Sequence, residues 1–324
     1  MVNLTKFEQN DNTPFQGQSV ATASKQEALG SFLDIHLGIV EQIYRKGKCR
    51  QYVYIETNSG CGYNPKARCD GSPIVALRYL TQKTDMPWQC VFIEKESSSC
   101  IKLAELVSEI DGVDAPIALI SEVGSRQFSF LNDGVASYPR IDLVGVDRSE
   151  LGLTIQDLLI QRRQSCVIVN FDNACALPQI WLPKHSYGLV YADPNALKDS
   201  PEEALRAFFQ NFNASRLDLL FNLDGHMRRR VIASQNKGYC SGYNDVRSLM
   251  RRVGKKYWWI RDPVSGTGAG SSWVFLFGAN YQDLKIKSLK QCGLSMHGVE
   301  SPKGGEVLAR LMGDSFPGQL TLPL

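Results

Sequence analysis

The chain has 324 residues, of which 43% are hydrophobic and 21% charged, and its formal net charge is +3. This composition is that of a globular protein long enough for one large domain or two small ones, and it excludes a largely disordered chain. No apolar run approaches the roughly 20 residues needed to cross a bilayer, and the polar N-terminus lacks the basic and apolar pattern of a secretion signal. We therefore expect a cytoplasmic protein without membrane contact.

The cysteines and the charge distribution give little support for a metal site or for a strongly basic protein. Nine cysteines are spaced irregularly without a CxxC pair, so reduced thiols are expected rather than zinc ligands or disulfides. A net charge of +3 does not by itself indicate a nucleic-acid partner. Local basic clusters nevertheless occur at Arg162-Arg163, at Arg228-Arg229-Arg230 and at Arg251-Arg252 with Lys255-Lys256.

Strands and helices alternate along the first third of the chain. Apolar residues at three- and four-residue spacing predict a helix over 25–45. The β-branched and aromatic runs 51–56 and 89–94 read as strands, and helices over 72–82 and 100–110 follow them. The alternation indicates a parallel sheet with right-handed crossover connections.

The pattern loosens over 112–161, which we interpret as an insertion at the edge of the sheet. It contains a candidate strand at 116–121 and a candidate helix at 153–161. Beyond it, three short apolar runs are typical of strands buried on both faces. These runs are 165–170, 187–192 and 217–223, with a helix near 201–212 between the last two.

The final strands differ from the rest because a short glycine-rich turn joins 256–261 to 272–278, which requires an antiparallel hairpin. A dinucleotide-binding domain stays parallel at this point. The pattern therefore predicts a doubly wound, Rossmann-like α/β fold with a seven-stranded, mostly parallel sheet that ends in an antiparallel hairpin. We expect this domain to span 25–280, with a flexible N-terminus over 1–24 and an extension over 281–324 that includes a helix near 304–312.

Acidic and small residues follow the predicted strands at the points where a doubly wound sheet binds ligands. Glu56 ends the first strand, and Asn58, Gly60 and Gly62 follow it in a turn whose glycines let a ligand approach the main chain. Glu94 ends the second strand, where its two oxygens can accept from the two hydroxyls of a ribose.

Later strands end in a similar way. Asp172 lies two residues past the strand 165–170, where it can accept from a ligand amino group or cap a helix. Asp193, Pro194 and Asn195 follow the strand 187–192, and the proline stiffens the turn that carries the Asp193 carboxylate.

These segments, in this order, resemble the three-Cys-motif partner protein family and, more broadly, the class I S-adenosylmethionine (SAM)-dependent methyltransferases. The similarity is carried by Tyr54 to Gly62, by Gly71-Ser72-Pro73, by Asp193-Pro194 and by Leu219 to Asn222. The resemblance implies that SAM binds at Glu56, Asn58, Gly60, Gly62, Glu94 and Asp172. It also implies that Asp193, Pro194 and Asn195 hold the methyl acceptor.

One departure separates the chain from base-amino methyltransferases, which have a second proline and an aromatic residue after the acid. Asn195 and Ala196 occupy those positions here, so a stacking aromatic would have to come from elsewhere, such as Tyr63 or Tyr191.

Three functions remain open from the sequence. The first is a SAM-dependent methyltransferase that acts on DNA or RNA. Its nucleic-acid substrate would be bound by Arg228, Arg229, Arg230, Arg251 and Arg252. The second is a methyltransferase-like binding subunit that works beside a partner protein. The third, a nicotinamide oxidoreductase, is disfavoured because the turn after Gly62 lacks the third glycine of the dinucleotide motif.

Overall fold

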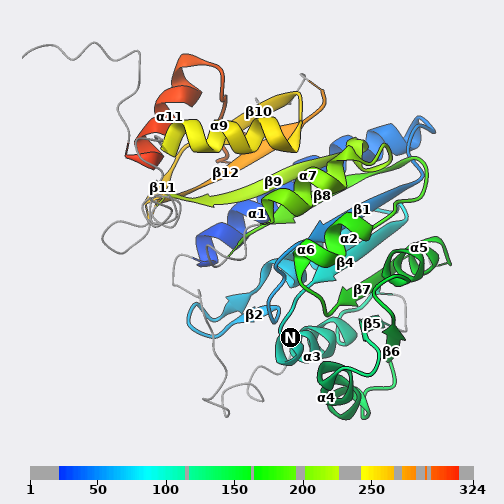
Figure 1. Cartoon of the computed structure of the whole chain (residues 1–324). Helices are drawn as coiled ribbons and strands as arrows, with labels where there is room; N and C mark the ends of the chain where they lie inside the picture. Colours follow the sequence, from blue (N-terminus) through cyan, green and yellow to red (C-terminus); the bar gives the residue numbers. More distant parts are fainter. Residues whose placement is uncertain are drawn as a thin grey trace, which may run out of the picture.

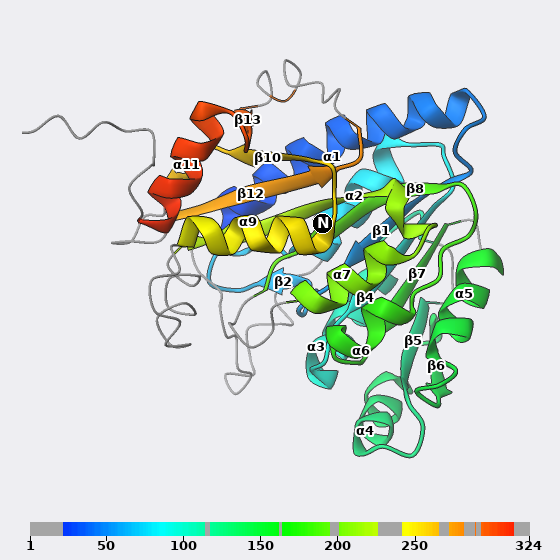
Figure 2. The same cartoon turned by 45° about the horizontal axis from the view of Figure 1, so that its top comes forward.

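A large β-sheet with helices on both faces forms the centre of the molecule (Figure 1 and Figure 2). The computed structural model describes residues 22–113, 117–161, 164–194, 201–225, 242–265, 272–281, 289 and 293–313. Asn195 and Arg228, Arg229 and Arg230 lie outside these ranges.

The seven strands expected from the sequence form the middle of this sheet in the order β7-β4-β1-β8-β9-β12-β10. They are β1 (Gln51–Glu56), β4 (Trp88–Ile93), β7 (Gln164–Val169), β8 (Ser186–Ala192), β9 (Leu217–Asp224), β10 (Tyr257–Arg261) and β12 (Ser272–Ala279). Nearly every residue of β1, β4 and β8 is buried, as in a sheet covered on both faces.

Strand directions confirm the predicted fold class. β7, β4, β1, β8 and β9 are parallel to one another, whereas β12 is antiparallel to both β9 and β10. The chain therefore has the Rossmann-like sheet of the methyltransferase type, with its antiparallel hairpin at the C-terminal end. Because the central strands are parallel, their carboxyl ends meet at one edge of the sheet and their amino ends at the other.

The insertion extends the sheet beyond β7. The expected strand is β5 (Ile117–Glu122), which lies between β7 and the edge strand β6 (Ile141–Val146). β6 is not among the strands predicted from the sequence, because its middle residues are exposed or half-buried and give no continuous apolar run. Two helices, α4 (Arg126–Val135) and α5 (Leu151–Gln161), complete this part of the molecule.

Shorter strands and helices complete the structure. β13 (Met296–Gly298) extends the sheet beyond β10, and α11 (Pro302–Met312) contacts β10, β13 and the helix α9 (Gly242–Val253). β11 (Val264–Ser265) pairs with β12. β2 (Tyr63–Asn64) and β3 (Cys69–Asp70) form a separate two-stranded ribbon after the glycine turn.

The two faces of the sheet are covered by different sets of helices. One face packs against α1 (Thr22–Arg45), α2 (Ser72–Lys83), α3 (Ser97–Ser108) and α4. The other packs against α5, α6 (Asn173–Ala176), the 3-10 helix η2 (Leu177–Gln179), α7 (Glu202–Gln210), α9 and α11. A further 3-10 helix, η4 (Ala214–Arg216), precedes β9.

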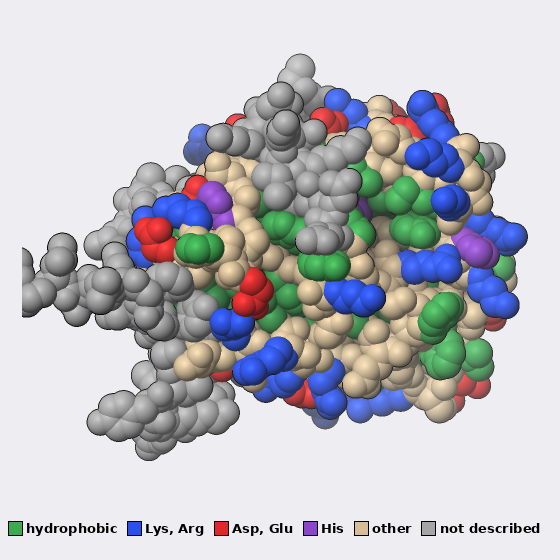
Figure 3. Space-filling model, turned by 90° about the horizontal axis from the view of Figure 1, so that it is seen from above, with side chains coloured by type: hydrophobic (Ala, Val, Ile, Leu, Met, Phe, Trp, Pro, Cys, Tyr) green, Lys and Arg blue, Asp and Glu red, His purple; other side chains and the backbone are tan. Residues whose placement is uncertain are grey.

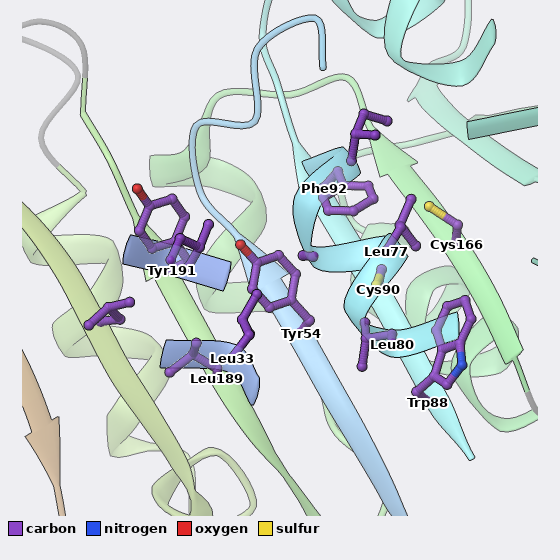
Figure 4. Close-up of a cluster of buried hydrophobic side chains, with 14 of the residues drawn as sticks. Leu33, Tyr54, Leu77, Leu80, Trp88, Cys90, Phe92, Cys166, Leu189 and Tyr191 are labelled. Atoms are coloured by element: carbon purple, nitrogen blue, oxygen red, sulfur yellow. The ribbon is translucent and has the colours of Figure 1, made fainter. Parts of the chain in front are cut away.

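Large aromatic side chains fill the core beneath α1 and α2. Figure 4 shows Tyr54 of β1 and Tyr191 of β8 beside Leu33 of α1, with their hydroxyl groups directed the same way. Both rings are fully buried, and each hydroxyl donates to a carboxylate two residues further along the chain. These two core tyrosines therefore contact the acidic residues at the carboxyl edge.

The structure bears on the expectations for the cysteines and for membrane-spanning segments. The cysteines in the described ranges are free thiols. No helix among the described residues combines the length and the apolar character that a membrane crossing requires.

Candidate functional site at the carboxyl edge

The carboxyl edge brings the predicted acids to the ends of neighbouring strands. Glu56 ends β1 and Glu94 directly follows β4, while Asp172 and Asp193 follow β7 and β8. Since the sheet order is β7-β4-β1-β8, the four carboxylates lie along one side of the sheet.

The glycine turn after β1 is closely packed except at one residue. Gly60 and Gly62 have φ angles of +62° and +79°, which favour glycine. A Cβ atom at Gly62 would lie 2.9 Å from the Leu103 side chain, and one at Gly71 would lie 2.8 Å from the Gly62 carbonyl carbon. A Cβ atom at Gly60 would meet nothing within 4 Å. The turn therefore leaves open space at Gly60, where a ligand can approach the backbone.

Glu94 fastens this turn to the start of α3. Its Oε2 accepts from the Gly60 backbone N–H at 2.8 Å, and its Oε1 accepts from the Glu96 N–H at 2.9 Å. Burial raises the pKa of Glu94, and the two N–H donors act in the opposite direction. Each carboxylate oxygen keeps one acceptor position for a further donor.

Glu56 is the most deeply buried of the acids, with no exposed surface. Its oxygens accept from the hydroxyls of Tyr54, at 3.0 Å, and of Ser72. Burial raises the pKa of Glu56 well above its ordinary value, against the effect of the two hydroxyl donors, and the charges of Asp193 and Glu94 raise it further. Glu56 thus joins the end of β1 to the start of α2 and contacts protein groups on both oxygens.

Ser72 is not the N-cap of α2, although a serine directly before a proline is typical of that position. Gly71 is the N-cap of α2, and Ser72 is its first helical residue. The Ser72 hydroxyl therefore serves the buried Glu56 carboxylate and not a backbone N–H of the first helical turn.

Asn58 and Asp172 both make local bonds. The Asn58 Oδ1 accepts from the Thr57 hydroxyl at 2.9 Å. The Asp172 Oδ1 accepts from the Ala174 N–H at 2.8 Å and caps α6, one of the two interpretations that the sequence left open.

Asn170, which the sequence analysis did not select, connects three segments of this edge. Its Nδ2 donates to the backbone carbonyls of Glu94 and Lys95 at 3.0 Å, and its Oδ1 accepts from the Ser97 hydroxyl at 3.1 Å. An asparagine directly after a buried strand was the available signal, but its partners lie more than 70 positions away in the sequence.

Asp193 has partners from three other positions in the chain. Asn222 of β9 donates its Nδ2 to Asp193 Oδ1 at 2.6 Å, and the Tyr191 hydroxyl donates to Oδ2 at 3.3 Å. Lys25, in the first turn of α1, forms an ion pair with Oδ2 at 2.8 Å. The side chains of Lys25 and Asp193 are 17% and 14% exposed, so this pair lies near the surface.

The Asn222 side chain adds an unusual feature next to Asp193. Asn222 is 4% exposed, and its Oδ1 has no hydrogen-bond partner among the residues that the structure describes. Because the Asp193 carboxylate only accepts, the amide nitrogen must face it, which leaves the Asn222 carbonyl oxygen buried and unpaired. An unpaired buried acceptor is uncommon and costly in native proteins.

The aromatic and basic residues proposed from the sequence as contacts for a nucleic acid differ in their exposure. The Tyr191 ring is fully buried and offers no face for stacking a base. Arg251 and Arg252 are exposed in the last turn of α9, where Arg252 pairs with Glu202 at 2.8 Å. No group of three metal-ligating side chains occurs among the residues that the structure describes.

Comparisons with known proteins give remote similarities only. No family model matches the chain, and no curated protein sequence matches it. Protein LPL1258 from Legionella pneumophila str. Philadelphia 1, of the DUF519 family, is 12% identical over 86% of this chain and 91% of its own, with a TM-score of 0.46.

Two further solved structures show weaker similarity to the chain. A fibrillarin pre-rRNA processing protein of Methanococcus jannaschii is 12% identical over 72% of this chain and 69% of its own, with a TM-score of 0.29. TrmN from Thermus thermophilus is 14% identical over 73% and 74%, with a TM-score of 0.20. All three scores are below 0.5, so the fold assignment rests on the strand order and strand directions described above.

Proposed function

We propose that the chain is a SAM-dependent methyltransferase. The observation that carries this proposal is the closure of the glycine turn by Glu94, which leaves Gly60 facing open space beside a carboxylate with free acceptor positions. A ligand with a ribose and a charged amino acid part matches a glycine backbone and an acid at adjacent strand ends.

Different residues at the ends of β1, β4 and β7 would bind different parts of SAM. Glu94 would accept from the ribose hydroxyls, and Asp172 would use its second oxygen for the adenine amino group. The backbone near Asn58, Gly60 and Gly62 would lie against the methionine part. Glu56 would stabilise the conformation of this turn through its bonds to the end of β1 and the start of α2. When bound, SAM would supply an electrophilic methyl group.

The acceptor would lie at the end of β8. Asp193 would accept from the amine that receives the methyl group, and Pro194 would keep the turn rigid. Asn195 follows in the sequence. The unpaired Asn222 Oδ1, next to Asp193, would offer a second acceptor to the same amine. These side chains would orient the nitrogen and stabilise positive charge that develops on it during transfer.

We further propose nucleic acid as the substrate class. A polyanionic substrate requires cations outside the reaction centre. Arg228, Arg229, Arg230, Arg251 and Arg252 are the contiguous clusters that the sequence offers for this role.

A second function, a methyltransferase-like subunit that binds without catalysis, is favoured by one contact. The Lys25 ammonium lies 2.8 Å from Asp193 Oδ2, at a position that an acceptor amine would need. A methyltransferase would have to displace Lys25 from Asp193, whereas a binding subunit would keep the ion pair.

Thermal unfolding in the presence of SAM tests the first proposal. A ligand that binds only the folded state, at about 100 times its Kd, stabilises the protein by about 2.7 kcal/mol. We expect SAM to raise the Tm and NAD to leave it unchanged. Glu94→Ala should remove the SAM effect, while the exposed neighbour Glu96→Ala should retain it. Failure of SAM to shift the wild-type Tm would refute both methyltransferase-like functions.

A further inference from the structure

The amino edge of the sheet, opposite the candidate site, carries a group of cations that are exposed except for the half-buried Arg216. They lie in the three loops that precede β1, β8 and β9 and at the start of β10. We define the amino-edge patch as Lys46, Lys48, Arg50, Trp181, Lys184, His185, Phe212, Arg216 and Lys256. Figure 3 shows blue Lys and Arg side chains and a purple histidine gathered at the right-hand end of the molecule, the end at which α1 finishes.

Hydrogen bonds join these loops into one surface. The Arg50 N–H donates to the His185 carbonyl at 3.0 Å, which connects the loops before β1 and β8. The Asn213 side chain donates to the Leu182 carbonyl at 3.0 Å, which connects the loops before β8 and β9. A contact of 3.1 Å between Arg216 Nη1 and His185 Nδ1 reinforces the second junction.

The start of β10 is attached to the same surface. The Asn280 side chain donates to the Ser215 carbonyl at 2.9 Å, and its Oδ1 accepts from the Lys256 N–H at 3.1 Å. The patch is therefore held in place by bonds between segments that lie far apart in the sequence.

Little negative charge accompanies the patch. The segments 45–50, 181–185, 211–216 and 255–256 contain no Asp or Glu. Glu41 pairs with Arg45 beside the patch. Within the part of the chain that the structure describes, no carboxylate forms an ion pair with Lys46, Lys48, Arg50, Lys184 or Lys256.

Two aromatic side chains stand out from this cationic surface. Trp181 is 55% exposed and Phe212 is 77% exposed, and they belong to the two loops that the bond from Asn213 to Leu182 joins. Arg216 lies over the ring of Tyr187, 5.8 Å from its centroid, which fixes the guanidinium at the surface. Exposed rings of this size offer flat apolar faces to a binding partner.

We propose that the amino-edge patch is a docking surface for single-stranded nucleic acid. The cations would contact backbone phosphates, and Trp181 and Phe212 would stack on unpaired bases, the combination that sequence-tolerant single-strand binding requires. The edge from β1 to β10 spans four strand spacings, or about 20 Å. That length suits a linear polyanion. This surface is independent of the proposed SAM site, and the residues expected from the sequence to hold nucleic acid are not part of it.

An anionic membrane is the other partner that a basic and aromatic surface could attract. A membrane-bound surface buries a broad continuous apolar face. The patch has only two strongly exposed aromatic side chains among its cations, so its chemistry favours phosphates and separate bases over a lipid interior.

Binding of labelled single-stranded RNA and DNA oligonucleotides, followed by fluorescence anisotropy at several salt concentrations, tests the proposal. The triple variant Lys48→Glu, Arg50→Glu, Lys184→Glu should lower the slope of log K against log salt by about 2, because each lost phosphate contact contributes about 0.7. The variant Trp181→Ala, Phe212→Ala should weaken binding by at least about 30-fold, because two stacking contacts are lost.

A matched control reverses three exposed charges elsewhere, at Arg126, Lys303 and Arg310, and should bind like the wild type. The proposal is overturned if the wild type binds no oligonucleotide, if the patch variants bind as tightly as the control, or if the patch binds phosphatidylserine vesicles and not oligonucleotides. The Tm shift with SAM, measured on the same variants, separates the two proposals. Loss of oligonucleotide binding with an intact SAM shift supports the patch. A missing SAM shift in the wild type rejects both methyltransferase-like functions and leaves the patch proposal standing.

Discussion

The two edges of the sheet handle charge in different ways. At the carboxyl edge, Glu56, Glu94 and Asp193 are largely buried and each carboxylate is held by hydrogen bonds from other segments. At the amino edge, Lys48, Arg50, Lys184 and Lys256 are exposed and form no ion pair with an acid among the described residues. Buried, oriented carboxylates can define the position of a small ligand, whereas exposed cations attract a flexible polyanion over a wide area. This difference underlies the two proposals, methyl transfer at one edge and nucleic-acid docking at the other.

The largest effect expected from this comparison is on methyl transfer. Asp193→Ala should lower the transfer of labelled methyl groups from SAM to nucleic acid by at least about 100-fold, the usual range for the loss of one oriented electrostatic group. SAM binding, measured by the Tm shift, should persist. Lys25→Met, which removes the ammonium that now contacts Asp193, should retain or increase transfer.

Wild-type protein that binds SAM but labels no DNA, RNA or protein would contradict the catalytic role of the carboxyl edge. It would support the binding subunit in its place.

The second prediction concerns a buried acid at the amino edge. Asp218 Oδ2 accepts from the Tyr281 hydroxyl at 2.6 Å and lies 3.0 Å from His36 Nε2, while His36 Nδ1 lies 2.9 Å from the Tyr52 hydroxyl. Asp218→Ala should reduce the free energy of unfolding by about 3 kcal/mol, because two buried polar groups lose their acceptor. Urea unfolding measures this change.

The SAM-induced Tm shift of Asp218→Ala should equal that of the wild type. If it disappeared, the amino edge would be coupled to the cofactor region and the two edges would not act separately.

The smallest expected effect is a change in pH dependence at Glu56. Burial raises the pKa of this acid above its ordinary value of 4.5. Its stabilising contribution is therefore complete below pH 4.5 and is lost as the pH rises through the raised pKa of the folded state. Glu56→Gln should remove this decline, so the variant should gain stability relative to the wild type as the pH increases.

Unfolding in urea from about pH 5 to about pH 8 measures the difference between the two proteins. If the wild type instead became more stable than Glu56→Gln with rising pH, Glu56 would be ionised in the folded protein. An ionised Glu56 would be available to a charged ligand at this edge.

The sequence by itself determined the order of the strands along the chain and the residues that end them. Apolar runs bounded by Glu56, Glu94 and Asp193 predicted strands that differ from the structure by at most about one residue. This succeeded because strand periodicity and strand ends are local properties of the chain.

Only the tertiary structure decided which groups meet. Lys25 and Asn222 reach Asp193 from positions 168 and 29 residues away, as the residue numbers give by subtraction, and no local pattern pairs them. The amino-edge patch was missed for the same reason, since its cations come singly or in small groups from separate loops and not from one contiguous cluster. Parallel strands gather distant loop ends along one line, so the charge of an edge depends on the sheet order and not on any single stretch of sequence.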